Sequence, residues 1–374
     1  MKRAKLSILQ QDKTKKMILL MGPRQVGKTT LSKEVAKDFQ YLNYDRGRDR
    51  KIIHKLEWDR TRSLVILDEL HKMRKWKSWI KGVYDTEKRP PHFLVTGSAR
   101  LDVYRRGGDS LAGRHFSHRL HPFTVRELMG QMEPEETLDR ILKVGGFPEP
   151  FLENDPAKAG RWRASHLDVI LREDLIDLER VREIRSIEIL IDLLRERVGG
   201  LVSYSSLAEE LGVSVHTIKH WLEILGYLYV IFRVSPYSRN IARSLKKESK
   251  YYFYDTGAVE GNEGQKLENV VAGALLREID LCRDEQGLHG DLFFLRDKSK
   301  DEVDFLVTIN RKPRLLVEVK WNDDNFAKAL FRFKAQLSEP VQACQIVRNL
   351  SQPKSKDGVQ MTPVHEFLAN VKLG

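Results

Sequence analysis

An apolar stretch that runs into a glycine-rich loop constrains this chain more than any other feature. Met17–Met21 is apolar, Gly22–Thr29 fits the pattern G-x-x-x-x-G-K-T, and Leu31–Phe39 has a helix-like pattern. A strand, a glycine-rich loop and a helix in this order form the context that a P-loop requires. The chain is therefore predicted to contain an α/β domain that binds a phosphate group at this loop.

The residue types of the loop suit a nucleotide. Gly22 and Gly27 would let backbone N–H groups turn toward phosphate oxygens, and the start of the following helix would add partial positive charge. Lys28 would reach the β- and γ-phosphates, and the Thr29 hydroxyl would bind Mg²⁺. Thr30 joins the predicted nucleotide-binding residues. ATP and Mg²⁺ are therefore the predicted cofactors.

A second apolar strand ends in adjacent carboxylates. Ser63–Leu67 precedes Asp68 and Glu69, and this arrangement behind a P-loop is typical of a Walker B motif. Asp68 would hold Mg²⁺, directly or through water, and Glu69 would orient or deprotonate the attacking water. The predicted reaction is direct attack of water on the γ-phosphate.

Polar residues also follow or precede other predicted strands. Ser98 comes just after an apolar run, and the ends of parallel strands line one edge of the sheet. Ser98 would therefore contact the γ-phosphate or the attacking water, with a turn-capping role as the alternative. An arginine finger, supplied in cis or in trans, would neutralise charge on the γ-phosphate, and Arg114 is favoured for this role, with a surface salt bridge as the alternative. The other candidates are Arg100, Arg105 and Arg106.

Composition limits the class of protein. The 374 residues are 41% hydrophobic and 32% charged, as in soluble globular chains of about two or three domains. No apolar run is long enough to span a membrane or to form a signal peptide. The two cysteines, Cys282 and Cys344, argue against a disulfide framework or a zinc site and favour the reducing cytoplasm. The net charge of +12 favours nucleic acid as a partner, and DNA first.

Three regions differ in their patterns. Residues 1–150 alternate strand-like and helical segments, which predicts a P-loop NTPase domain with a parallel sheet. Residues 151–260 are predicted to form a helical linker and a winged helix, and residues 261–374 a small α/β domain. The predicted strands of the first region are Met17–Met21, Tyr41–Tyr44, Ser63–Leu67, His92–Thr96 and His115–His121.

The middle region contains a helix-turn-helix pattern. Residues 155–198 are predicted to be mostly helical, and two further helices are predicted on either side of Gly212, the second capped by Ser214. A strand-like run, Gly226–Val234, and a basic loop follow, which together predict a winged helix. The first turn of the second helix would face DNA bases, and the loop would track phosphates, unless the module serves only for packing. The helix residues are Ser214, His216, Thr217, Lys219 and His220, and the loop contains Arg239, Arg243, Lys246, Lys247 and Lys250.

Acidic residues are spaced along predicted strands of the last region. Glu318 and Lys320 lie two residues apart, so they share one face of a strand. A hairpin through residues 309–314 would bring Asp304 beside Glu318, and the preceding helix could supply Glu268. The predicted elements are the helices Lys266–Ile279 and Asn325–Leu337 and the strands Leu292–Arg296, Glu302–Thr308, Leu315–Lys320 and Gln342–Val347.

Eight short motifs follow one another in a characteristic order. They are Gly22–Thr30, Leu67–His71, Thr96–Arg100, Leu111–Arg114, Gly145–Glu149, Phe253–Gly257, Leu267–Asn269 and Glu302–Phe305. This order resembles the predicted AAA+ superfamily ATPases of bacteria and archaea, which typically carry a second, C-terminal domain of uncharacterised role. The resemblance covers nearly the whole chain and implies ATP binding.

The C-terminal acids resemble the core of PD-(D/E)XK nucleases. In that chemistry, Asp304 and Glu318 would hold Mg²⁺, the metal would activate a water, and Lys320 would position the nucleophile. Glu268 joins this predicted catalytic set. Phosphodiester cleavage and a binding or oligomerisation role without cleavage are alternatives here.

Three hypotheses about function follow. The protein is an ATP-regulated nuclease, a nucleotide-switched DNA-binding regulator with an inactive nuclease fold, or a protein-remodelling ATPase. The charge and the predicted winged helix favour the first two. A homo-oligomer or a protein partner is compatible with each of them.

Overall fold

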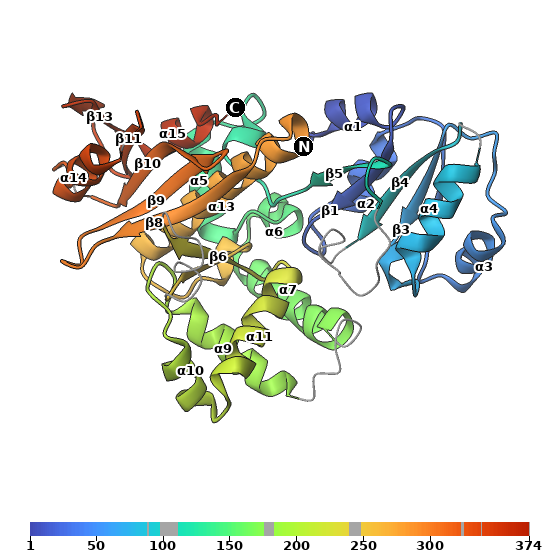
Figure 1. The fold of residues 1–374 in the computed structure, drawn as a ribbon, viewed down its shortest axis with the longest axis horizontal. Coiled ribbons are helices and arrows are strands. Elements are labelled where there is room, and N and C mark those ends of the chain that lie inside the picture. The colour runs from blue at the N-terminus through green and yellow to red at the C-terminus, as the bar shows by residue number, and fades with distance from the viewer. Residues whose placement is uncertain are drawn as a thin grey trace. The chain divides into compact units, whose positions relative to one another are not determined.

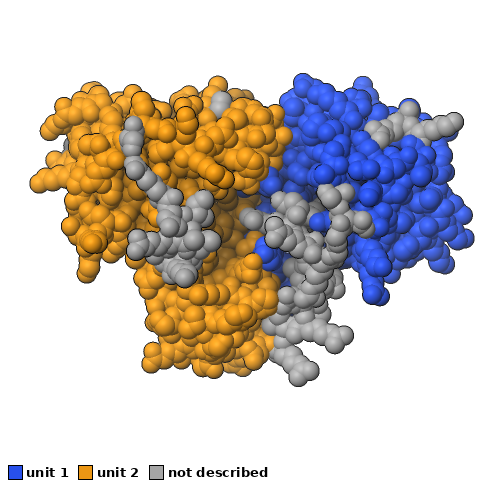
Figure 2. Space-filling model, viewed as in Figure 1, with its two compact units in different colours: residues 1–121, 168–180, 227–229 blue, residues 122–167, 181–226, 230–374 orange. Residues whose placement is uncertain are grey.

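The computed structural model describes residues 1–87, 90–97, 111–175, 183–238, 248–322, 325–337 and 339–373. The chain divides into two compact units (Figure 2). Unit 1 comprises residues 1–121, 168–180 and 227–229, and unit 2 comprises residues 122–167, 181–226 and 230–374. Within the described ranges, no helix combines the length and the apolarity that crossing a membrane requires.

Unit 1 is built on a five-stranded sheet in which every neighbouring pair is parallel (Figure 1). The strands are β1 Met17–Met21, β2 Phe39–Asn43, β3 Leu64–Asp68, β4 His92–Gly97 and β5 His115–Arg119. Their spatial order is β2-β3-β4-β1-β5, so β4 lies between the P-loop strand and β3. The five strands predicted from the sequence are confirmed, with ends displaced by at most two residues.

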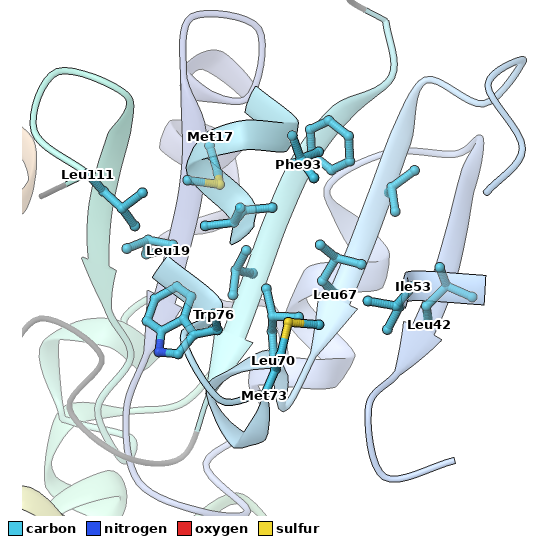
Figure 3. Close-up of a cluster of buried hydrophobic side chains, with 14 of the residues drawn as sticks. Met17, Leu19, Leu42, Ile53, Leu67, Leu70, Met73, Trp76, Phe93 and Leu111 are labelled. Atoms are coloured by element: carbon cyan, nitrogen blue, oxygen red, sulfur yellow. The ribbon is translucent and has the colours of Figure 1, made fainter. Parts of the chain in front are cut away.

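A cluster of buried apolar side chains packs along the sheet of unit 1 (Figure 3). Alternate residues of β1, Met17 and Leu19, reach this cluster together with Leu67 of β3 and Phe93 of β4. All residues of β1 and β3 are buried, which explains their continuous apolar sequence, because both faces of a parallel strand are covered. The helices of unit 1 are α1 Leu6–Asp12, α2 Lys28–Glu34, α3 Gly47–Lys55 and α4 Trp76–Thr86, with short turns at Leu70–Lys72 and Ile170–Asp174.

Unit 2 contains an eight-stranded mixed sheet with the order β12-β13-β11-β10-β9-β8-β6-β7. The strands are β6 Ile231–Pro236, β7 Lys250–Phe253, β8 Gly290–Arg296, β9 Glu302–Ile309, β10 Lys312–Lys320, β11 Gln342–Val347, β12 Lys354–Lys356 and β13 Val359–Pro363. The helices are α5 Pro134–Val144, α6 Pro148–Glu153, α7 Pro156–Val169, α9 Ile184–Arg195, α10 Tyr204–Leu211, α11 Val215–Tyr227, α13 Glu263–Gln286, α14 Lys328–Gln336 and α15 Val364–Asn370. The last residues of α7 and α11 are counted with unit 1.

Local signals set most helix ends in unit 2. Gly212 ends α10 in the left-handed conformation, with φ of 65°, and the Ser214 hydroxyl accepts a hydrogen bond from the backbone N–H of Thr217 at 3.0 Å. Both features agree with the predicted helix-turn-helix pattern. The predicted strand Gly226–Val234 is wrong in its first part, because α11 continues to Tyr227 and β6 begins at Ile231. The strands β12 and β13 and helix α15 were not predicted.

Three of the recognised motifs pack against one another inside unit 2. The Asn269 side chain accepts from the backbone N–H of Phe253 at 2.8 Å and donates to its carbonyl at 3.0 Å. Asp255 accepts from Arg163 Nε at 2.6 Å and from the backbone N–H of Gly257 at 3.0 Å. A Cβ atom on Gly145 would lie 2.3 Å from Asp255 Oδ1, so this position has room only for glycine. These contacts give the three motifs a packing role.

Candidate functional site

The glycines of the P-loop are required by backbone geometry. Gly22 has φ of 149°, and a Cβ atom there would lie 2.2 Å from the carbonyl oxygen of Leu120, so a side chain has no room. Gly27 has φ of 97° and precedes the first residue of α2. The loop therefore follows β1 and leads directly into the N-terminus of α2, as the sequence predicts.

Lys28 lies within the loop rather than in solvent. Its side chain is buried, and Nζ donates to the carbonyl oxygens of Gly22 at 2.9 Å and Pro23 at 2.6 Å. Burial lowers the pKa of Lys28 to about 8, although the nearby carboxylates of Glu69 and Asp68 oppose the shift. The ammonium is thus held where the loop would surround a phosphate.

Asp68, at the end of β3, contacts side chains from β2, β4 and the P-loop helix α2. Its carboxylate accepts from the Thr29 hydroxyl at 2.9 Å and from the Tyr41 hydroxyl at 2.5 Å, and from the Thr96 hydroxyl. Burial and the bond to Asp68 raise the pKa of Tyr41 to about 12, so the phenol keeps its proton. Mg²⁺ prefers oxygen ligands and keeps several waters, so Thr29 and Asp68 fit the predicted ion.

Glu69 follows Asp68 at the end of β3. It adopts the left-handed backbone conformation, with φ of 55°, which few residues other than glycine adopt. Burial raises the pKa of its carboxyl, although the Lys28 ammonium opposes the shift. A carboxylate with a raised pKa in this position suits the predicted role as a general base.

His71 lies beside the two acids. Its Nε2 is 3.6 Å from Glu69 Oε2, and its Nδ1 is buried without a hydrogen-bond partner. Burial lowers the pKa of His71 to about 4, with Asp174 opposing the shift. The imidazole is therefore neutral near pH 7 and does not titrate in the range where ATP hydrolysis is measured.

Two acidic residues at this site were not predicted. The Arg24 side chain, in the P-loop, donates to Asp174 Oδ1 at 2.8 Å and to Glu173 Oε2 at 2.8 Å. Asp174 is buried, and burial raises the pKa of its carboxyl, with Arg24 opposing the shift and Glu69 adding to it. The turn Ile170–Asp174 thus brings two further carboxylates to the loop and holds Arg24 in place.

The position of Arg114 restricts the arginine-finger expectation for this residue to a finger supplied in trans. The carbonyl of Arg114 accepts from the backbone N–H of Met17, and its side chain pairs with Asp85 at 2.8 Å. Arg114 therefore lies at the amino end of β1, whereas the P-loop follows the carboxyl end, about 13 Å farther along the strand. Arg114 does not reach the P-loop of its own chain, so a finger role would need a second protomer. Ser98, Arg100, Arg105 and Arg106 lie outside the described residues.

The predicted C-terminal acids come together in unit 2. Asp304 Oδ2 accepts from the backbone N–H of Val319 at 2.9 Å, and Glu318 Oε2 accepts from the backbone N–H of Asp304 at 3.4 Å. Lys320 Nζ lies 2.8 Å from Glu318 Oε1, as the shared strand face predicts. Burial and the charge of Glu268 raise the pKa of the Asp304 carboxyl, so Glu268 on α13 adjoins these acids, and it also accepts from Lys250 at 3.2 Å.

Lys250 corrects a prediction about the basic loop. The sequence grouped it with the residues of the basic loop, but only 1% of the residue is exposed. It is the first residue of β7 and lies among carboxylates. Arg239, Arg243, Lys246 and Lys247 lie outside the described part of the chain. Ser214, which precedes α11, and His216 and Lys219 on α11 are exposed, and Thr217 and His220 are half-buried.

Three family models match consecutive parts of the chain. Residues 14–129 match an AAA domain, residues 135–262 match a domain of unknown function (DUF8612), and residues 263–367 match another domain of unknown function (DUF4143). The first match suggests an AAA-type ATPase domain that binds nucleotide, and it contains the P-loop, Asp68 and Glu69. The winged-helix and nuclease-like assignments remain predictions.

Proteins similar to this chain occur in bacteria and archaea. An uncharacterized protein of Mycobacterium tuberculosis is 28% identical over 245 residues, which make up 64% of this chain and 54% of that protein. An uncharacterized protein of Methanocaldococcus jannaschii is 23% identical over 365 residues, 87% of this chain and 79% of that protein. An uncharacterized protein of Haemophilus influenzae is 23% identical over 264 residues, 65% of this chain and 62% of that protein. This chain thus spans about half the length of the mycobacterial relatives that it matches.

Proposed function

We propose that this protein binds ATP together with Mg²⁺ and hydrolyses the γ-phosphate bond by direct attack of water. The observation that carries the proposal is the hydrogen bond of 2.9 Å between Thr29 of the P-loop and Asp68 at the end of β3. Lys28 and Glu69 adjoin these two residues in the chain, and each carboxylate influences the pKa of Lys28. The four side chains thus supply the parts that phosphoryl transfer to water requires.

Each side chain has a distinct task in this proposal. Lys28 would exchange its two carbonyl partners for oxygens of the β- and γ-phosphates. Thr29 and Asp68 would hold Mg²⁺, which neutralises phosphate charge when bound. Glu69 would orient the attacking water and accept its proton. Tyr41 and Thr96 donate to the Asp68 carboxylate and would keep it oriented toward the ion.

The test is steady-state release of phosphate from ATP by the full chain, with Mg²⁺ and with EDTA in excess. We expect hydrolysis that requires Mg²⁺ and saturates with ATP. Hydrolysis that is equal in the presence of EDTA would contradict the role of Thr29 and Asp68. Absence of ATP binding by the folded protein would contradict the proposal as a whole.

The activity is expected to depend on pH through Lys28. Because burial lowers the pKa of this residue to about 8, the ammonium is charged below that pH and neutral above it, and only the charged form attracts phosphate. The kcat/KM for ATP, which reports groups of the free enzyme, should therefore fall about tenfold per pH unit above about pH 8. The Lys28→Arg variant stays charged throughout, so its lower kcat/KM should lack this fall. A level wild-type profile up to about pH 10 would refute the assignment.

A second candidate function is nucleotide-regulated binding of DNA. The observation that favours it is the exposed start of α11, where Ser214 precedes the helix and His216 and Lys219 lie on it, in a chain with a net charge of +12. Polar and basic residues at the start of such a helix suit contact with base edges and phosphates. Running the ATPase assay with duplex and single-stranded DNA tests this candidate. Stimulation by DNA supports it, whereas rates indifferent to DNA favour a protein client.

A further inference from the structure

The acidic cluster of unit 2 is arranged around the side chain of a lysine. Lys250 Nζ lies 2.6 Å from Glu302 Oε1, 3.2 Å from Glu268 Oε1 and 3.8 Å from Asp304 Oδ1. The three acids come from β9 and α13, whereas Lys250 begins β7. One ammonium group therefore joins three elements of the unit.

The Lys250 side chain is enclosed in this position by the carboxylates of Glu268, Asp304 and Glu302. The side chain is 2% exposed, and Nζ lies 5.6 Å from the centroid of the Phe294 ring. The ammonium thus lies inside the cluster, closed off from solvent.

The oxygens of the two predicted metal ligands already have protein partners. Asp304 Oδ2 accepts from the backbone N–H of Val319, and Asp304 Oδ1 faces the Lys250 ammonium. Glu318 Oε2 accepts from the backbone N–H of Asp304, and Glu318 Oε1 pairs with Lys320. Mg²⁺ is usually held by one or two carboxylates and fills the rest of its octahedral shell with waters, so a metal at these acids would compete with the lysine and backbone N–H partners for the carboxylate oxygens.

The carboxylate oxygens of Glu268 also lie against other parts of the protein. Its Oε1 accepts from the Tyr252 hydroxyl at 2.6 Å as well as from Lys250. A Cβ atom on Gly199 would lie 2.6 Å from Glu268 Oε2, so this oxygen lies close to the Gly199 backbone. The third predicted catalytic acid therefore contacts the lysine and the tyrosine hydroxyl as well as lying near the other acids.

We infer that the Lys250 ammonium is the resident cation of this cluster in place of a divalent metal, and that unit 2 therefore does not cleave nucleic acid with a metal. The metal site expected at Asp304 and Glu318 does not fit the donors that surround them. The acids instead form an ion-pair network that holds β7 and β9 on α13. Of the hypotheses drawn from the sequence, this inference favours those without cleavage, and it holds whether or not unit 1 hydrolyses ATP.

Titration of the full chain with Mn²⁺, followed by the electron paramagnetic resonance signal of the free ion, tests the inference. The Asp68→Asn background removes the predicted metal ligand of unit 1, so that any remaining site is assigned to unit 2. In this background, we expect no Mn²⁺ site that disappears on adding Asp304→Asn. A stoichiometric site that is lost with Asp304→Asn would overturn the inference, and this comparison needs no change at Lys250.

Removing the Lys250 ammonium should let Mn²⁺ bind at the acidic cluster. Lys250→Met keeps a stem of similar length without the charge, so we expect a gain in Mn²⁺ affinity of at least about tenfold, which Asp304→Asn cancels. The matched control is Lys320→Met, which removes a more exposed ammonium, 36% exposed, from Glu318 and should produce no comparable gain. Equal gains in both variants would overturn the special role of Lys250. Circular dichroism spectra establish that each variant is folded.

A cleavage assay completes the test. Duplex and single-stranded DNA incubated with the wild-type chain and Mn²⁺ should remain intact on a gel, with and without ATP. Cleavage that is absent from the Asp304→Asn variant would overturn the inference even if Mn²⁺ binding were too weak to titrate.

Discussion

Replacing Glu69 by glutamine is expected to leave ATP affinity within about threefold of wild type and to slow hydrolysis by about a hundredfold to a thousandfold. Glutamine keeps the size of the side chain and can still orient a water, but it cannot accept the proton. A thousandfold loss corresponds to about 4 kcal/mol of activation free energy. ATP affinity by isothermal titration and phosphate release under saturating ATP measure the two effects separately.

The matched variant for Glu69→Gln is Lys28→Ala, which should abolish ATP binding. Lys28 is the cation of the loop, and its ammonium already binds two loop carbonyls, so its removal affects the phosphate site itself. The two variants should therefore differ in kind: one loses binding, and the other loses only turnover. An equal loss of ATP binding in both would show that Glu69 supports the loop rather than the reaction.

The nucleotide site could be predicted because its signals are local in the sequence. The P-loop is one continuous pattern, and an apolar strand that ends in two acids places Asp68 and Glu69 at the carboxyl edge of a parallel sheet. The hydrogen bond between Thr29 and Asp68 agrees with that prediction. Arg24 and Asp174 carry no comparable signal, because they are 150 residues apart and an acid on a helix is ordinarily solvated.

Predictions failed where the sequence does not show whether a side chain is buried or at which end of the strands a residue lies. Lys250 follows a run of basic residues, so it was grouped with them, although it faces inward from β7. Arg114 precedes β5, whereas the P-loop follows β1, and parallel strands place these positions at opposite edges of the sheet. The pairing of Asp304 with Glu318 was predictable, because a hairpin and the period of two fix it, but the Lys250 ammonium beside Asp304, Glu268 and Glu302 was not.

Replacing Asp255 by alanine is expected to lower the free energy of unfolding of unit 2 by about 3–5 kcal/mol. Its carboxylate pairs with Arg163 at 2.6 Å, and the two side chains are only 10% and 18% exposed. Removing one partner leaves a guanidinium without its counter-charge in a largely buried place, which costs more than the pair itself contributes. The change also removes the acceptor for the backbone N–H of Gly257. Chemical denaturation followed by circular dichroism measures the effect.

A control variant separates the effect of this buried ion pair from a general sensitivity of unit 2 to the loss of any ion pair. Asp192→Ala removes a carboxylate that is 63% exposed and pairs with Arg195, and such surface pairs contribute about 0–1 kcal/mol. Adding Arg163→Met to Asp255→Ala removes the stranded charge while keeping an apolar stem, so part of the stability should return. If the free energy of unfolding of Asp255→Ala lies within about 1 kcal/mol of the wild-type value, or if adding Arg163→Met lowers it further, the ion pair does not hold these motifs together. Recovery in the double variant would instead establish that the motif Phe253–Gly257 acts through the charge that it buries.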